Sequence, residues 1–471
     1  MTADSDTADG IAYELEVGGA VMQAEPPLVI DVIADLSPGG KEARTPIDER
    51  RFRELHPENF DDLLANWTPT LDIALGETDA PASVRLEFRS LADFEPDAIR
   101  QQVDTAPAVG RYIDEVINNE RLRNLEGTLR GLKALASRMT DYGRVRLRVL
   151  SMTKDELAAS LQAAGGLEES PLYREVYESN YGTFGGLPSG LIIADYTFSH
   201  APGDVRVLQD LARLAAASMC VVSAGTSPRL FGAGDWQSLK GRPRLAFALT
   251  SKAHQSWRSL RRSAEARHLM MTAPRLRTAG NGLATGGYAI AADLVDSMLA
   301  GAGMNMSGTS CQLGKAEVEF DEAERDAFED SGLLLVGQAS ARPPEHLRTV
   351  RKPERHFDDG RTLDSLNAGG LINLLWNLQF ARAIKCMSRD AIGAFGDAAA
   401  MEAHLNQWLA RYVSGEGRLL SEARIRVNSL TGLLYNSGVH VVTLRIRPDL
   451  PGAMFARDAT YQFQVLTSQY D

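Results

Sequence analysis

Short apolar segments alternate with amphipathic helices between residues 144 and 223, and this alternation constrains the fold more than any other feature. Residues 144–149 alternate Arg with Val or Leu, which predicts a strand with one buried and one basic face. Helices at 154–163 and 205–219 and strands at 191–195 and 220–223 follow in turn. Strands that alternate with helices imply a parallel or mixed sheet. We therefore predict an α/β fold (α+β mixed), with mixed sheets flanked by helices.

The residues before this region predict a smaller sheet. Residues 28–34 form a nearly continuous apolar run, typical of a strand that is covered on both faces. Strands at 70–75 and 84–88 and a helix near 57–66 complete a small sheet with one helix. From residue 113 to 135 apolar residues recur every three or four positions, which predicts one long helix.

The chain becomes less regular after this region. Residues 226–344 are rich in Gly, Arg and Met, and we expect an irregular middle insertion there. The last predicted strand lies close to the end of the sequence, so it could pair with a strand outside its own sheet. The C-terminal elements expected are helices at 363–387 and 398–412 and strands at 423–427, 439–446 and 461–466.

Composition excludes several classes of protein. The 471 residues carry a formal net charge of −12, which argues against a nonspecific nucleic-acid binder but leaves room for a local basic surface. Three widely separated cysteines favour neither a disulfide framework nor a zinc site, and fit a reducing cytoplasm. The acidic start resembles no signal peptide, and no apolar run is long enough to span a membrane. We expect a cytoplasmic chain of more than one domain, without nucleic acid or membrane insertion.

A search for catalytic and cofactor motifs finds none that is complete. Residues 308–315 depart from a phosphate-binding loop in spacing, and 280–286 depart from a dinucleotide fingerprint, so ordinary loops are preferred over nucleotide sites. Ser189 lacks the nucleophile-elbow pattern. The eight histidines never occur as HxxxH. No catalytic residue, cofactor or metal ligand is therefore expected.

One basic segment has two interpretations. Arg258, Arg261 and Arg262 concentrate positive charge around Trp257. They could form a contact patch for an acidic partner, or they could be the solvated face of a helix.

The first hundred residues contain an ordered set of short segments: 13–19 (YELEVGG), 29–37 (VIDVIADLS), 51–52, 59–61, 69–71 and 86–97 (LEFRSLADFEPD). No single segment is diagnostic. As an ordered set they resemble TssB (VipA), the small sheath protein of bacterial type VI secretion systems.

A second ordered set follows residue 113: the segments 125–132 (LEGTLRGL), 172–177, 181–186 (YGTFGG), 193–196, 257–261, 274–275 and 408–412 (WLARY). These segments resemble TssC (VipB or EvpB), the large sheath protein, and the two resemblances together cover nearly the whole sequence. The family usually has Trp where Leu129 stands.

This resemblance implies a natural fusion with a contractile tail-sheath-like fold, a small-subunit region at 1–108 and a large-subunit region at 109–471. It implies a structural, non-enzymatic sheath subunit that forms a helical homo-oligomer around an inner tube of the Hcp type, with baseplate components as further partners. Neighbouring sheath subunits exchange strands through linkers, and a contact that does not close on itself gives a tube. The matching linker strands are Tyr13, Glu14, Leu15, Glu16 and Val17 at one end and Tyr461, Gln462, Phe463, Gln464, Val465 and Leu466 at the other.

The departures from the family leave other functions open. The two regions meet near residues 105–114, without the leading segment of TssC that carries the helix bound by the ATPase ClpV, so ClpV is not counted among the expected partners. A noncontractile sheath, or an element of the cap or baseplate, is the first alternative. An α/β enzyme with an unrecognised site is the second.

Overall fold

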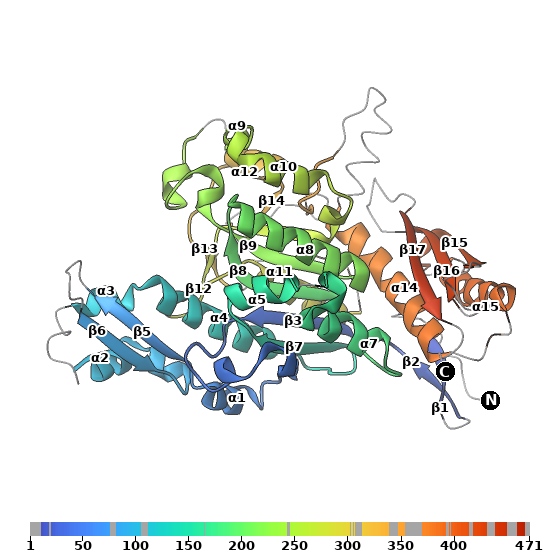
Figure 1. Ribbon diagram of the computed structural model, residues 1–471, viewed down its shortest axis with the longest axis horizontal. Coiled ribbons are helices and arrows are strands. Elements are labelled where there is room, and N and C mark those ends of the chain that lie inside the picture. The colour runs from blue at the N-terminus through green and yellow to red at the C-terminus, as the bar shows by residue number, and fades with distance from the viewer. Residues whose placement is uncertain are drawn as a thin grey trace.

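The computed structural model describes residues 11–17, 20–75, 82–104, 112–163, 165–242, 245–301, 303–304, 306, 313–338, 347–353, 370–391, 395, 397–413, 418–430, 439–449 and 459–466. A central sheet with helices on both faces lies between a hairpin at one end of the molecule and a three-stranded sheet at the other (Figure 1).

The central sheet has seven strands in the order β14-β10-β9-β8-β3-β7-β4. Only β4 runs antiparallel to its neighbour. All seven residues of β3 are buried, because β3 lies between β7 and β8 and is covered on both faces. The strands are β3 (Leu28–Ala34), β4 (Arg53–Glu54), β7 (Val145–Ser151), β8 (Leu191–Phe198), β9 (Val221–Thr226), β10 (Leu269–Ala273) and β14 (Leu333–Leu335).

Two sets of helices cover the faces of this sheet. Adjacent strand residues point to opposite faces; accordingly Ile193 belongs to the apolar cluster that includes α4 and α11, and Ile192 to the cluster that includes α5 and α8. Gly287 starts α11 close to the sheet, where an added Cβ would lie 2.9 Å from Ile193 and Ser223. The covering helices are α4 (Glu120–Ala136), α5 (Lys154–Leu161), α8 (Pro202–Ser218) and α11 (Gly287–Leu299).

The structure confirms the predicted alternation of strands and helices, with three corrections. The first hundred residues do not form a separate small sheet, since β3 lies inside the central sheet. The predicted helix at 113–135 is two helices, because Asn119 caps α4 by accepting a hydrogen bond from the N–H of Arg121 at 3.0 Å. The middle region is not an insertion, since it supplies β10 and β14 to the sheet.

Smaller units flank the central sheet. Helices α14 (Leu371–Asp390) and α15 (Ala398–Ala410) pack with β15 (Leu420–Ser429), β16 (Val439–Pro448) and β17 (Ala459–Leu466) at the C-terminal end (Figure 1). The other described elements are β1 (Tyr13–Val17), β2 (Ala20–Ala24), α1 (Phe60–Trp67), β5 (Thr70–Leu75), β6 (Ala82–Glu87), α2 (Pro96–Asp104), α3 (Ile113–Ile117), α6 (Pro171–Tyr173), α7 (Ser179–Tyr181), α9 (Leu245–Ala248), α10 (Gln255–Arg262), β11 (Leu276–Arg277), β12 (Leu283–Ala284), β13 (Lys315–Ala316) and α12 (Glu322–Asp330).

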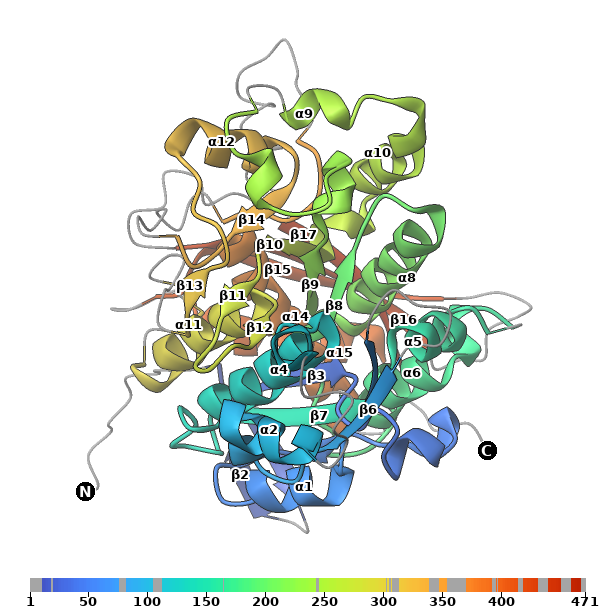
Figure 2. The same ribbon diagram turned by 90° about the vertical axis from the view of Figure 1, so that its left-hand side faces the viewer.

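The view along the long axis shows how the two sequence regions interleave (Figure 2). The α1, α2 and β6 elements of the small-subunit region lie below β3 and α4, and the α9, α10 and α12 elements lie at the opposite end of the view. The predicted boundary at residue 108 falls outside the described residues and stays a prediction.

His268 is an interior residue that should make stability depend on pH. Its side chain is 2% exposed, and Nδ1 lies 2.9 Å from the carbonyl oxygen of Cys220. Burial lowers the pKa of His268 to about 4. In the unfolded chain the imidazole takes up a proton near pH 6.5, whereas in the folded chain it stays neutral down to about pH 4. The contribution of neutral His268 to the free energy of unfolding is therefore present above pH 6.5 and is lost as the pH falls toward 4.

We expect the wild-type chain to lose up to about 3 kcal/mol of unfolding free energy through this group between about pH 6.5 and 4. The variant H268Q keeps a donor for Cys220 and should lack this component. Urea denaturation of both proteins across this pH range measures the difference. Parallel pH profiles for the two proteins would contradict the assignment.

Candidate assembly surfaces

The C-terminal sheet has two edge strands, β15 and β17, and the predicted linker strand is β17. The strand order is β15-β16-β17, and β16 and β17 run antiparallel with Thr443 opposite Gln462. Tyr461, Phe463 and Val465 are buried, whereas the residues between them are exposed. The period of two confirms the predicted strand at 461–466, with one face packed on the protein.

The N-terminal strand β1 forms a hairpin with β2, and its first residues are held by the C-terminal helices. The indole N–H of Trp408 donates to the carbonyl oxygen of Ala12 at 2.7 Å, and the hydroxyl of Tyr412 lies 2.9 Å from both the N–H and the carbonyl oxygen of Ala12. Tyr13 donates to Asp390 at 3.1 Å. Burial raises the pKa of the Tyr13 phenol well above its usual value.

Both predicted linker strands are therefore strands that pair within the chain. An unpaired strand exposes main-chain N–H and C=O groups, and β2 and β16 supply the partners here. Whether β1 and β17 exchange between copies stays a prediction. We describe no side chains for Leu15, Glu16, Val17 and Leu466.

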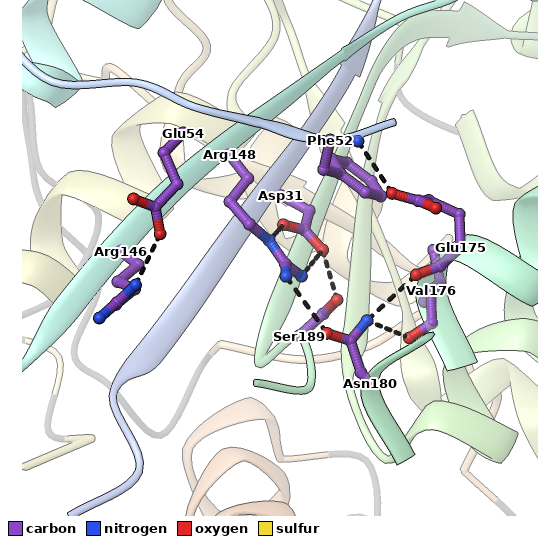
Figure 3. Close-up of polar contacts among 9 residues, drawn as sticks. All are labelled: Asp31, Phe52, Glu54, Arg146, Arg148, Glu175, Val176, Asn180 and Ser189. Atoms are coloured by element: carbon purple, nitrogen blue, oxygen red, sulfur yellow. Dashed lines mark hydrogen bonds and ion pairs between the residues drawn. The ribbon is translucent and has the colours of Figure 1, made fainter. Parts of the chain in front are cut away.

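A buried polar cluster joins the two sequence regions, and we call it the Asp31 joint (Asp31, Arg148, Asn180 and Ser189). Arg148 on β7 donates Nε to Oδ1 of Asp31 at 2.7 Å and Nη2 to Oδ2 at 2.9 Å (Figure 3). Ser189 donates its hydroxyl to the same carboxylate, which is fully buried. The Nη1 of Arg148 donates to Asn180 at 3.2 Å.

Further contacts extend this connection along the sheet. The N–H of Phe52 donates to Glu175 at 2.9 Å, and Arg146 pairs with Glu54 at 2.7 Å (Figure 3). Two arginines of the basic face predicted for the strand at 144–149, Arg146 and Arg148, thus pair with carboxylates of the small-subunit region, and the third, Arg144, donates to the carbonyl oxygen of Met298. Sequence reasoning missed these pairs, although a lone Asp within the apolar run 28–34 was a signal.

The structure corrects the predicted basic patch. Arg261 is 8% exposed and donates to the carbonyl oxygens of Val350 and Asp330, both at 3.0 Å. Burial lowers the pKa of Arg261 to about 10. Arg261 is an interior residue and cannot belong to a surface patch, whereas Arg262 is exposed and Arg258 partly exposed. The role of these two remains a prediction.

The segments that partly match catalytic or nucleotide-binding motifs show no such site in the described residues. Ser189 is part of the Asp31 joint. Residues 283–284 form β12 and residue 287 begins α11, so part of the 280–287 segment is regular rather than loop. Most of the 308–315 segment lies outside the described residues. In the described part of the chain, no group of three or more His, Cys, Asp or Glu side chains could hold a metal ion.

A hollow of about 300 Å³ lies at the C-terminal ends of β3 and β8, where α/β enzymes bind ligands. Asp195 lines it and accepts hydrogen bonds from Thr128 at 2.6 Å, Thr285 at 2.7 Å and Tyr288 at 2.8 Å. A carboxylate with three protein donors is engaged in holding α4 and α11 against the sheet. The hollow is also lined by Asp35, and burial raises the pKa of its carboxyl to about 6.

The helices in the described residues include none that is both long and apolar enough to cross a membrane.

Comparisons with known proteins assign both regions. Residues 97–280 match the family described as EvpB/VC_A0108, tail sheath N-terminal domain, and 364–451 match EvpB/VC_A0108, tail sheath gpW/gp25-like domain. Residues 10–145 match the family described as Type VI secretion system, VipA, VC_A0107 or Hcp2.

Two curated relatives agree with these family matches. The type VI secretion system sheath protein TssC1 of Pseudomonas aeruginosa is 26% identical over 355 residues, which cover 64% of this chain and 71% of TssC1. The sheath protein TssB1 of the same organism is 31% identical over 100 residues, which cover 20% of this chain and 57% of TssB1. The chain therefore belongs to the VipA (TssB) and VipB (TssC) families of type VI secretion sheath proteins and joins both in one polypeptide.

Proposed function

We propose that this sheath protein assembles with copies of itself into a helical tube around an inner tube of the Hcp type, through exchange of β1 and β17 between neighbours. The observation that carries the proposal is the place of β17, an edge strand that pairs with β16 alone and packs one face on the protein. We further infer that the protein is structural rather than catalytic and that baseplate components contact the ends of the tube.

Strand exchange would use the same hydrogen bonds and the same buried side chains that join β16 and β17 within one chain. A β17 strand from a neighbouring copy would meet β16 in the register that the same chain uses, with Tyr461, Phe463 and Val465 returned to the same buried positions. Exchange of an identical element between copies therefore costs little. Because the donor and acceptor surfaces differ, the contact is heterologous and can continue as an open helical polymer.

The receiving surface for β1 lies on the same C-terminal unit. Trp408 and Tyr412 bind the main chain of Ala12, and α14 contacts β1, β16 and β17. In an exchanged assembly, the same side chains would bind Ala12 of a neighbouring copy. One unit built from α14, α15, β15 and β16 would then receive both linkers.

Deletion of residues 1–20 tests this role of the N-terminal strand. We expect a folded chain that forms no tubes in negative-stain electron micrographs, because β1 and the Ala12 contacts are lost. Deletion of residues 1–9 is the matched control, since it keeps Ala12 and β1, and should leave tubes intact. Tubes formed by the longer deletion would refute the linker role.

A noncontractile sheath, or a cap or baseplate element, is the second candidate. The match to TssB1 covers 57% of that protein, so part of TssB1 has no counterpart in the aligned residues. Tubes of two distinct widths in electron micrographs select contraction, and tubes of one width under all conditions select the noncontractile role.

A further inference from the structure

The outer edge of β15 is already occupied by side chains of α15. Asn406 places its amide against Ile425, accepting from the N–H with Oδ1 at 2.9 Å and donating to the carbonyl oxygen with Nδ2 at 2.9 Å. One turn earlier on the helix, Glu402 accepts from the N–H of Val427 at 2.8 Å. We call Glu402 and Asn406 the edge pair.

The edge pair copies the hydrogen bonds of an added strand. Residues four apart on a helix lie on the same face, and the outward main-chain groups of an edge strand recur every two residues. Asn406 and Glu402 therefore reach two successive outward positions of β15, at Ile425 and Val427. A carboxamide presents an N–H donor beside a C=O acceptor, which are the groups that a neighbouring peptide unit would present to Ile425. Edge strands in proteins are commonly protected by a covering helix.

The two edges of the C-terminal sheet differ in whether helix side chains bind their main chain. Helix α15 packs along β15, whereas α14 contacts β16, β17 and β1. Within the described residues, we find no side chain that hydrogen bonds to the main chain of β17. A hollow of about 530 Å³ is lined by the edge pair together with Val427, Asn428 and Ser429. A strand that added here would need several consecutive main-chain bonds, and the edge pair already takes the outward N–H groups of Ile425 and Val427 in the middle of this edge.

We propose that the edge pair closes the β15 side of the sheet, so that a strand from a second copy can add only on the β16 and β17 side. This inference rests on the proposed function for its biological meaning, because one-sided addition would give each subunit a single direction of linkage. The edge pair would also prevent two copies from pairing through their β15 strands, a contact that ends growth or leads to aggregation.

Cross-linking of the unassembled full chain tests the proposal. Asn428 is an exposed residue of β15, and N428C in a Cys311→Ser background provides a reporter for a bis-maleimide cross-linker. Removal of the edge pair by E402A together with N406A should raise the yield of cross-linked dimer by about tenfold over the reporter alone, because a competing set of hydrogen bonds is lost.

Matched variants separate edge opening from general damage. Q407A changes an exposed residue of the same helix and should match the reporter, and E402Q keeps an acceptor for Val427 and should stay near it. If the double variant loses its circular dichroism spectrum, the single variant E402A against E402Q provides the comparison. Folded E402A and N406A proteins without extra dimer would overturn the proposal.

A density map of wild-type tubes provides the second measurement. A neighbouring strand bonded to β15, with the edge pair displaced, would overturn the one-sided account. A strand on the β16 and β17 side with the edge pair in place would support it. Because the cross-linking uses unassembled chain, absence of tubes would count against the proposed function alone.

Discussion

Substitution of Asp31 by Ala is expected to lower the free energy of unfolding by about 3 to 5 kcal/mol, because it leaves the guanidinium of Arg148 buried without its counter-charge. Asp31 is fully buried, and the Arg148 side chain is 15% exposed. Two parallel hydrogen bonds and the contact to Asn180 fix the guanidinium in place. R148A should be similarly destabilising, and urea denaturation measures both.

The chain provides a matched exposed pair as control. Asp72 and Arg85 face each other across β5 and β6 with side chains 64% and 71% exposed. R85A should therefore cost no more than about 1 kcal/mol. A double variant that replaces Asp31 and Arg148 by Leu and Met should recover much of the loss, since a buried pair contributes little beyond an apolar pair of similar volume. Equal losses for D31A and R85A would contradict the role of the Asp31 joint.

A disulfide between β16 and β17 is expected to abolish tube formation when it is formed before assembly. Thr443 and Gln462 lie opposite each other, with the amide of Gln462 3.3 Å from the hydroxyl of Thr443. Opposite Cα atoms in antiparallel strands are about 4.5 to 5.5 Å apart, within the range that a disulfide spans. Oxidised T443C/Q462C should stay a folded monomer, because its β17 cannot leave, and reduction should restore tubes in electron micrographs.

The hairpin of β5 and β6 supplies the control for this lock. D72C/R85C joins two strands that the proposal keeps within one subunit. Its oxidised form should assemble like the wild type. Tubes formed by oxidised T443C/Q462C at the wild-type yield would mean that β17 stays in its own subunit.

The sequence predicted the strands and helices in which apolar residues follow a regular pattern along the whole element. A seven-residue run with six apolar residues identified β3, and the alternation of apolar and polar residues identified β17. Helix α11 was missed because residues of every side are buried from Gly287 to Val295, so no amphipathic stripe marks it. Strands β10 and β14 were missed because each is short and lies in a Gly-rich and Met-rich region.

The candidate surfaces were only partly predictable for a different reason. The two terminal strands could be found because each is a local pattern. The Asp31 joint could not, because Asp31 and Arg148 meet only through the neighbouring positions of β3 and β7. The edge pair could not either, since Glu402 and Asn406 resemble solvated helix residues until α15 is placed along β15.

The most direct test of strand exchange is the same cysteine pair oxidised after assembly. T443C/Q462C would be assembled under reducing conditions, oxidised as intact tubes, and separated on a denaturing gel without reductant. Exchange of β17 predicts a ladder of covalently linked subunits, because the cysteine introduced on β16 of one copy then meets the cysteine introduced on β17 of another. Intact tubes that yield only monomers with an internal disulfide would contradict the account.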